Sequence, residues 1–119
     1  ENIEIWGDGT QTRSFLYIDE CINGIRKLME SDWSGPVNLG SDEMVTINAL
    51  VKTVETISGK KLGRKYIKGP QGVRGRNSDN KLIQEKLGWS PKYPLIKGIQ
   101  QTYDWILDQI NIENLKQTG

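Results

Sequence analysis

The sequence contains no histidine and a single cysteine, Cys21. Without these residues the chain cannot carry a histidine-based catalytic triad, a zinc site of the usual cysteine–histidine kind or an internal disulfide. It also lacks a Gly-x-Gly-x-x-Gly dinucleotide fingerprint and a Gly-x-x-x-x-Gly-Lys-Ser/Thr phosphate loop. We therefore expect no metal site of that kind, and we interpret Cys21, which falls on an apolar helical stripe, as a core residue.

Long apolar runs are missing as well. No stretch approaches the roughly 20 apolar residues of a membrane span, and no signal peptide is present, so we expect a cytoplasmic protein without a membrane partner. Hydrophobic residues make up 35% and charged residues 26% of the 119 residues, which is typical of one small globular domain over residues 1–119. Because the chain starts at Glu1 and enters a strand-like segment directly, we expect it to be part of a larger protein.

Turn residues and apolar periodicity predict short strands alternating with four helices. This alternation favours a small mixed α/β lobe rather than a complete doubly wound sheet. We expect Asp19 to cap the first helix and Thr46 the second, and we interpret the four tryptophans as packing anchors. The expected strands are residues 3–6, 14–18, 36–40 and 65–67, and the expected helices are residues 19–29, 47–58, a short segment from Ser78 or Asp79 to Leu87, and 95–110.

Two polar segments could bind a ligand. A glycine turn at residues 7–9 presents Gln11, Thr12 and Arg13 at the start of a strand. A turn followed by a solvated strand edge would give the same pattern. On the residues alone, both interpretations stay open.

The loop "GPQGVRGRNSDN", residues 69–80, places Arg74 and Arg76 among glycines and follows them with Asp79. Arginine can fork two hydrogen bonds onto phosphate oxygens, and glycine lets the backbone approach a ligand closely. Asp79 could orient Arg76 or accept from a sugar hydroxyl. Alternatively, Asp79 is a helix cap and the arginines are solvated.

Positive charge is concentrated between Glu55 and Asp79, a stretch without an acidic residue. Such a run could bind nucleic acid, but the chain as a whole carries a net charge of only +1. A solvated face or a small-anion site is the favoured interpretation. The basic residues are Lys60, Lys61, Arg64, Lys65, Lys68, Arg74 and Arg76.

Several of these segments resemble, in order and spacing from about Ile3 to Ile110, the C-terminal lobe of nucleotide-sugar epimerases and dehydratases. These enzymes belong to the extended short-chain dehydrogenase/reductase family. The resemblance is carried by an arginine before an aromatic-rich strand and aspartate, an Asn-x-Gly-Ser strand end, an Arg-x-x-Asp pair and a Leu-Gly-Trp-x-Pro segment. These motifs are Arg13 with Phe15 to Asp19, Asn38 to Ser41, Arg76 with Asp79, and Leu87 to Pro91.

The resemblance implies a lobe that closes over a nucleotide diphosphate. It implies substrate contacts at Gln11, Thr12, Arg13, Arg76 and Asp79, and GDP-mannose or a related nucleotide sugar as the partner. A UDP- or dTDP-sugar is the alternative, and a free-standing nucleic-acid-binding module is a more distant one.

The resemblance also implies a division of labour between this lobe and a second domain. NAD, the Tyr-x-x-x-Lys pair and the acid/base cysteine would belong to an N-terminal Rossmann domain absent from this chain. The chain alone would then be inactive, an exposed apolar patch would mark where that domain docks, and the whole enzyme would be a homodimer.

Overall fold

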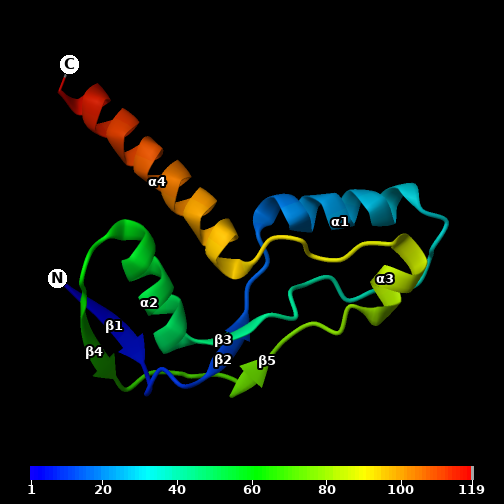
Figure 1. The fold of residues 1–119 in the computed structure, drawn as a ribbon, viewed down its shortest axis with the longest axis horizontal. Helices are drawn as coiled ribbons and strands as arrows, with labels where there is room; N and C mark the ends of the chain where they lie inside the picture. The colour runs from blue at the N-terminus through cyan, green and yellow to red at the C-terminus, as the bar shows by residue number, and fades with distance from the viewer. Residues whose placement is uncertain (119) are drawn as a thin grey trace.

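The structure is a computed structural model that describes residues 1–118 of the chain. Four helices and short strands confirm the predicted small mixed α/β lobe, which is flat, with extents of 50 × 42 × 22 Å (Figure 1). The elements in chain order are β1 (Asn2–Trp6), β2 (Thr12–Ser14), α1 (Ile18–Glu30), β3 (Met44–Thr46), α2 (Ile47–Ser58), β4 (Gly63–Ile67), β5 (Gly75–Arg76), α3 (Lys81–Leu87) and α4 (Leu95–Gln117).

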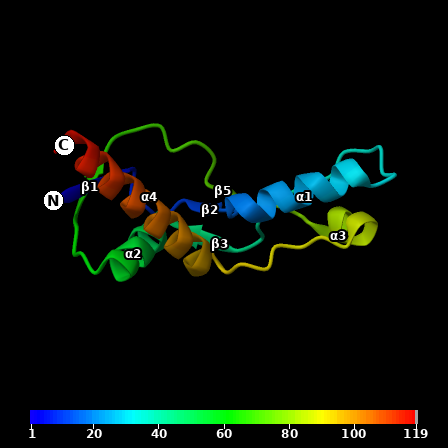
Figure 2. The ribbon, with the colours of Figure 1, turned by 90° about the horizontal axis from the view of Figure 1, so that it is seen from above.

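The strands form two small sheets. β1 pairs with β4 in parallel, and in the other sheet β2 lies between antiparallel β3 and parallel β5. The helices α1 and α3 lie at one end of the molecule, whereas α2 lies beside the sheets and α4 extends away from them (Figures 1 and 2). β2 is therefore the central strand of its sheet. It pairs with β3, which precedes α2, and with β5, which follows β4.

Side chains and glycines set the ends of the helices. The Thr46 hydroxyl accepts a hydrogen bond from Ala49 N at 3.0 Å, which confirms the predicted cap of α2. Gly59 ends α2 with a φ of 68°, a left-handed conformation that glycine adopts without strain. The start of α4 is capped by a side chain from a distant part of the sequence. Glu43 Oε2 accepts from Leu95 N at 2.8 Å.

Two strand predictions were wrong. The strand expected at residues 14–18 is β2 at Thr12–Ser14, because the chain leaves the sheet before Tyr17, which is the N-cap residue of α1. Residues 36–40 form no strand. The carbonyl of Gly40 instead accepts from Asn80 Nδ2 at 2.8 Å, so this segment packs against the loop before α3.

Two predicted helix starts were also wrong. Asp19 does not cap α1 but lies inside its first turn. The helix α3 begins at Lys81 rather than at Ser78 or Asp79. The Asp79 carboxylate accepts from Lys81 N at 3.1 Å and the Ser78 hydroxyl donates to Asn80 Oδ1 at 2.6 Å, so these side chains hold a turn ahead of the helix.

The tryptophans differ from one another in burial. Trp89 is 3% exposed and packs against Gly24 of α1, which confirms it as an anchor. Trp6 and Trp105 are 51% and 63% exposed, so their interpretation as packing anchors was wrong. Cys21 is half-buried rather than fully enclosed. The buried apolar side chains are Ile5, Val51, Ile83, Trp89 and Leu95.

An apolar stripe on α1 faces solvent. Its side chains repeat at helical spacing, which places them on one face of the helix. They are 46–79% exposed, so the expected exposed apolar patch is present. The residues are Ile18, Ile22, Ile25 and Met29.

Candidate functional site

Arg13 and Arg76 are register partners on the neighbouring parallel strands β2 and β5. Residues in register on adjacent strands project from the same face of a sheet, so the two arginines lie side by side. Like charges on neighbouring strands repel each other. The fold thus brings together two of the five predicted contact residues and creates a local excess of positive charge.

The Arg13 guanidinium is held by backbone carbonyls. Its Nη1 donates to Thr12 O at 2.6 Å and its Nη2 donates to Gln71 O at 2.9 Å. The second bond ties β2 to the glycine-rich loop, where Gly72 adopts a φ of 66°. An arginine fixed by neutral carbonyls keeps its full charge and further N–H donors for another ligand.

The Arg76 side chain is exposed, and its guanidinium forms no hydrogen bond or ion pair within residues 1–118. Its partner Arg13 also forms no ion pair in that part of the chain. The pair therefore has no internal carboxylate to neutralise it. An anion with several oxygens, bridging the two guanidinium groups, would remove the repulsion and satisfy their donors.

The other three predicted contact residues lie differently. Gln11 is buried, with 9% of its surface exposed, and its Nε2 donates to Trp6 O at 2.9 Å. The Thr12 hydroxyl lies against the backbone of β5, where a Cβ on Gly75 would stand only 2.7 Å from it. Asp79 shares no hydrogen bond with Arg76 within residues 1–118, and its Oδ1 accepts from Lys81 N.

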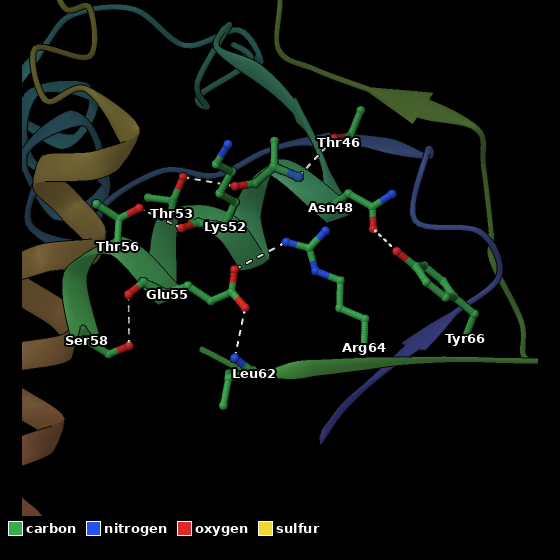
Figure 3. A network of polar contacts seen from close by, with 11 residues as sticks. Thr46, Asn48, Lys52, Thr53, Glu55, Thr56, Ser58, Leu62, Arg64 and Tyr66 are labelled. Atoms are coloured by element: carbon green, nitrogen blue, oxygen red, sulfur yellow. Dashed lines mark hydrogen bonds and ion pairs between the residues drawn. The ribbon is translucent and has the colours of Figure 1, made fainter. Parts of the chain in front are cut away.

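A network around Asn48, at the start of α2, holds the turn before β2. Asn48 Nδ2 donates to Asp8 O at 3.1 Å and Asn48 N donates to Gly9 O at 3.0 Å. Its Oδ1 accepts from the Tyr66 hydroxyl of β4 at 3.0 Å (Figure 3). Sequence reasoning missed Asn48, whose position after the Thr46 cap is typical of an ordinary helix residue. This network fixes the turn from which Arg13 extends.

Asp8 forms its own bonds inside that turn. The Thr10 hydroxyl donates to Asp8 Oδ1 at 2.6 Å and Thr10 N donates to the same oxygen at 2.9 Å. These two hydrogen bonds, first the hydroxyl's and then the backbone's, lower the pKa of Asp8 from its ordinary value of 3.8, and the charge of Arg74 adds to the effect. The Asp8 carboxylate is therefore ionised at neutral pH.

The basic stretch after Glu55 is partly neutralised. Glu55 Oε1 accepts from Leu62 N at 3.0 Å and Glu55 Oε2 pairs with Arg64 at 3.3 Å (Figure 3). The backbone bond first, and then Arg64, lower the pKa of the Glu55 carboxyl. Lys65 lies 3.8 Å from a carboxylate oxygen of Glu4. These pairs join β4 to α2 and to β1, and neither includes Arg13 or Arg76.

Residues 1–118 contain no group of three or more histidine, cysteine, aspartate or glutamate side chains that could hold a metal ion. Among the helices of that range, none is long and apolar enough to cross a membrane. The sequence also lacks the Gly-x-Gly-x-x-Gly fingerprint of NAD-binding domains.

The Tyr-x-x-x-Lys spacing does occur in this chain, at Tyr93 and Lys97, and sequence reasoning overlooked it. Pro94 separates Tyr93 from the helix α4 that carries Lys97. The Tyr93 ring stacks on Tyr17 with centroids 5.3 Å apart, and the Lys97 ammonium lies 4.5 Å above its centre. The Lys97 ammonium therefore contacts the face of the Tyr93 ring and not its hydroxyl. This contact is a packing interaction.

Comparisons with known proteins bear on this geometry. Residues 1–40 match the profile of the NAD dependent epimerase/dehydratase family. The chain is 53% identical, over 98% of its length, to GDP-mannose 3,5-epimerase of Arabidopsis thaliana. It is 35% identical, over 83% of its length, to UDP-glucuronic acid decarboxylase 5 of the same plant.

Solved structures with nucleotide sugars are similar as well. UDP-glucuronic acid 4-epimerase of Bacillus cereus, in complex with UDP-glucuronic acid and NAD, has a TM-score of 0.85 and 32% identity over 92% of this chain. The chain covers 36% of that structure and 31% of the Arabidopsis GDP-mannose 3,5-epimerase. It thus spans about a third of the length of the proteins it matches.

Proposed function

The chain belongs to the NAD-dependent epimerase/dehydratase family, and from that premise we propose that it is the substrate-binding lobe of a GDP-mannose 3,5-epimerase. The identity of 53% to the Arabidopsis enzyme supports this subfamily over the UDP-sugar enzymes, to which the identity is 35% or lower. The lobe's task is to bind and orient the nucleotide sugar, and the chemistry requires residues from the rest of the enzyme.

The observation that carries the proposal is the arginine pair. Arg13 and Arg76 lie in register on β2 and β5, and within residues 1–118 neither forms an ion pair. The two phosphate groups of a nucleotide sugar supply adjacent oxygens and the negative charge that the pair needs. Arg13 would contact the diphosphate from the central strand, and Arg76 from the glycine-rich loop.

The remaining predicted contacts take supporting parts in this proposal. Asp79 Oδ1 accepts from Lys81 N, which leaves Oδ2 for a sugar hydroxyl. Thr12 would support the site by holding β2 against β5, because its hydroxyl lies against Gly75 and its backbone N donates to Arg74 O. Gln11 lies two residues before Arg13 and would contact the nucleoside beside the diphosphate.

A UDP- or dTDP-sugar enzyme is the second candidate. Solved structures similar to this chain contain UDP-glucuronic acid or UDP-glucose. An arginine pair that grips a diphosphate does not depend on the base, so the same lobe would serve either nucleotide. Measured preference among GDP-, UDP- and dTDP-sugars separates these candidates.

The rest of the enzyme would supply NAD and cover the apolar stripe of α1. The stripe continues into an apolar hollow of about 450 Å³ between α1, α2 and α4, which includes Phe15 and Tyr103. Large exposed apolar areas usually mark an interface, so we place the NAD-binding domain there. A cytoplasmic homodimer is the assembly we propose for the whole enzyme.

A nucleic-acid-binding module remains the distant candidate, and its basic stretch is weakened by the Arg64–Glu55 and Lys65–Glu4 pairs. An oligonucleotide titration at two salt concentrations tests it. Tight binding that falls steeply with salt would support the module. Absence of binding, together with binding of GDP, would support the enzyme.

The direct test uses the full-length protein with GDP-mannose in D₂O. A 3,5-epimerase exchanges the sugar protons at C3 and C5, so NMR should detect deuterium at both carbons. Deuterium at neither carbon, with turnover of a UDP-sugar instead, would assign the lobe to the second candidate. No turnover and no binding of any nucleotide diphosphate would refute the enzyme proposal.

A further inference from the structure

The turn before α4 is held by two carboxylates from distant parts of the chain. Glu20, on α1, accepts through its Oε1 from Lys92 N and, at 3.1 Å, from Tyr93 N. Glu43, just before β3, accepts through its Oε2 from Leu95 N at 2.8 Å. The backbone at the start of α4 is therefore tied to α1 on one side and to the β2–β3–β5 sheet on the other.

The start of α4 has no local cap. A helix begins with N–H groups that lack partners inside it, and a side chain of the N-cap residue usually accepts from one of them. The N-cap residue of α4 is Pro94, whose side chain has no acceptor. Glu43 supplies the acceptor instead, and its negative charge interacts favourably with the positive end of the helix dipole. The position of α4 therefore depends on the position of Glu43.

Glu43 is joined to the strands of the arginine pair. It directly precedes β3, in which Val45 is the register partner of Arg13 on β2. The side chain of Met44 reaches β5, since its Cε would stand 3.3 Å from a Cβ on Gly75. Three consecutive residues thus connect the start of α4 with both strands that carry the arginines.

The turn that the carboxylates hold also forms part of the apolar hollow between α1, α2 and α4. Tyr93 and Leu95 line this hollow together with Phe15 and Tyr17, which follow β2. The rings of Tyr93 and Tyr17 stack with their centroids 5.3 Å apart. The hollow is the surface on which we place the NAD-binding domain. The two carboxylates therefore fix the turn that connects this surface with the strands of the arginine pair.

We propose that Glu20 and Glu43 are positioning residues for the epimerase reaction. They keep the docking surface in a fixed position relative to Arg13 and Arg76, so that a nucleotide sugar held by its diphosphate presents its sugar correctly to the other domain. Neither carboxylate contacts the substrate. A misplacement of about 1 Å, caused far from the reacting atoms, can lower a rate about 100-fold. This inference rests on the proposed function and adds the alignment of the two domains to it.

The test measures kcat and nucleotide affinity separately on the full-length protein. Glu43→Ala removes the acceptor for Leu95 N, and we expect it to lower kcat for GDP-mannose about 10- to 100-fold. The affinity for GDP, measured by calorimetry, should stay unchanged, because the arginine pair is intact. Glu20→Ala should give the same division between kcat and affinity. Glu43→Gln keeps an oxygen that can accept from Leu95 N, so it should recover most of the rate.

Asp42→Ala is the matched control. Asp42 is the neighbour of Glu43, and its exposed carboxylate has no hydrogen bond or ion pair within residues 1–118, so kcat and GDP affinity should not change. Amide hydrogen exchange provides a measurement that does not depend on turnover. The Leu95 amide should exchange faster in Glu43→Ala than in the wild type and at the wild-type rate in Asp42→Ala.

The outcomes separate this inference from the proposed function. An unchanged kcat in Glu43→Ala, or a GDP affinity that falls by the same factor as kcat, would overturn the positioning role and leave the diphosphate grip standing. Failure of the wild type to bind GDP and to turn over any nucleotide sugar would overturn the proposed function itself. If Glu43→Ala does not fold, Glu43→Asp decides. Its carboxylate keeps the charge but is one methylene too short for Leu95 N, so kcat should fall and GDP affinity should not.

Discussion

Replacing Arg76 by alanine should have opposite effects on the ligand-free and the ligand-bound protein. In the ligand-free protein Arg76 lies beside Arg13 in the β2–β5 register, and its guanidinium has no ion-pair or hydrogen-bond partner within residues 1–118. Removing it relieves a like-charge contact, so Arg76→Ala should raise the free energy of unfolding by about 0.2–1 kcal/mol. An arginine with a structural role would give the reverse.

Binding should change in the other direction and by more. A hydrogen bond to a charged group contributes about 1.5–3 kcal/mol, so Arg76→Ala should weaken GDP roughly ten- to a hundredfold. Because Arg76 is assigned to the diphosphate, UDP and inorganic pyrophosphate should weaken by the same factor. Arg76→Lys should recover part of the loss, since an ammonium cannot form the planar two-bond contact.

Arg13→Ala provides the contrast. It should weaken the same ligands to a similar extent, but it also removes the bonds to Thr12 O and Gln71 O, so it should destabilise the ligand-free protein. Chemical denaturation gives the stabilities, calorimetry gives the affinities, and Arg26→Ala, an exposed arginine on α1, is the control for lost charge. If Arg76→Ala left pyrophosphate binding intact while Arg74→Ala abolished it, the assignment of the diphosphate to the register pair would be refuted.

Thr46→Ala should lower the free energy of unfolding by about 1 kcal/mol, because it removes the acceptor for Ala49 N at the start of α2. Thr56→Ala, which removes a hydroxyl bonded only within the same helix, should cost less when both are compared by denaturation. Gly72→Ala should weaken GDP binding, because its φ of 66° strains alanine and would move the loop that holds Arg13. Gly59→Ala meets the same strain at a φ of 68° and should leave binding unchanged, so equal losses would contradict a specific role for Gly72.

The helices were predictable because each depends on local signals. The apolar spacing of α2 with Thr46 before it and Gly59 after it is fully contained in a short stretch of sequence. The strands β3 and β5 were missed because they are three and two residues long and exist only through pairing with β2. No local propensity identifies such strands, since their hydrogen-bonding partners lie far away in the sequence.

The candidate site was predictable as a set of residues but not as an arrangement. Arg13 and Arg76 were proposed through the family resemblance, and their pairing in register came only from the structure. Asn48 and Asp8 were missed because their roles depend on backbone groups of the turn before β2. For Asp79 the sequence offered two interpretations, a ligand contact and a helix cap. Its hydrogen bond with Lys81 N, at the start of α3, agrees with the cap.

The glycine-rich loop connects these observations. The strand β5 pairs with β2 over only two residues, and the loop before it is held by Thr12 N on Arg74 O and by Arg13 on Gln71 O. Glycines make this loop costly to order, because they lose the most conformational freedom. An anion that bridges Arg13 and Arg76 crosses the β2–β5 pairing and so stabilises the ordered loop by its own binding energy. We therefore expect the glycines and the unpaired arginines to act together, so that a diphosphate bound across Arg13 and Arg76 would stabilise the loop.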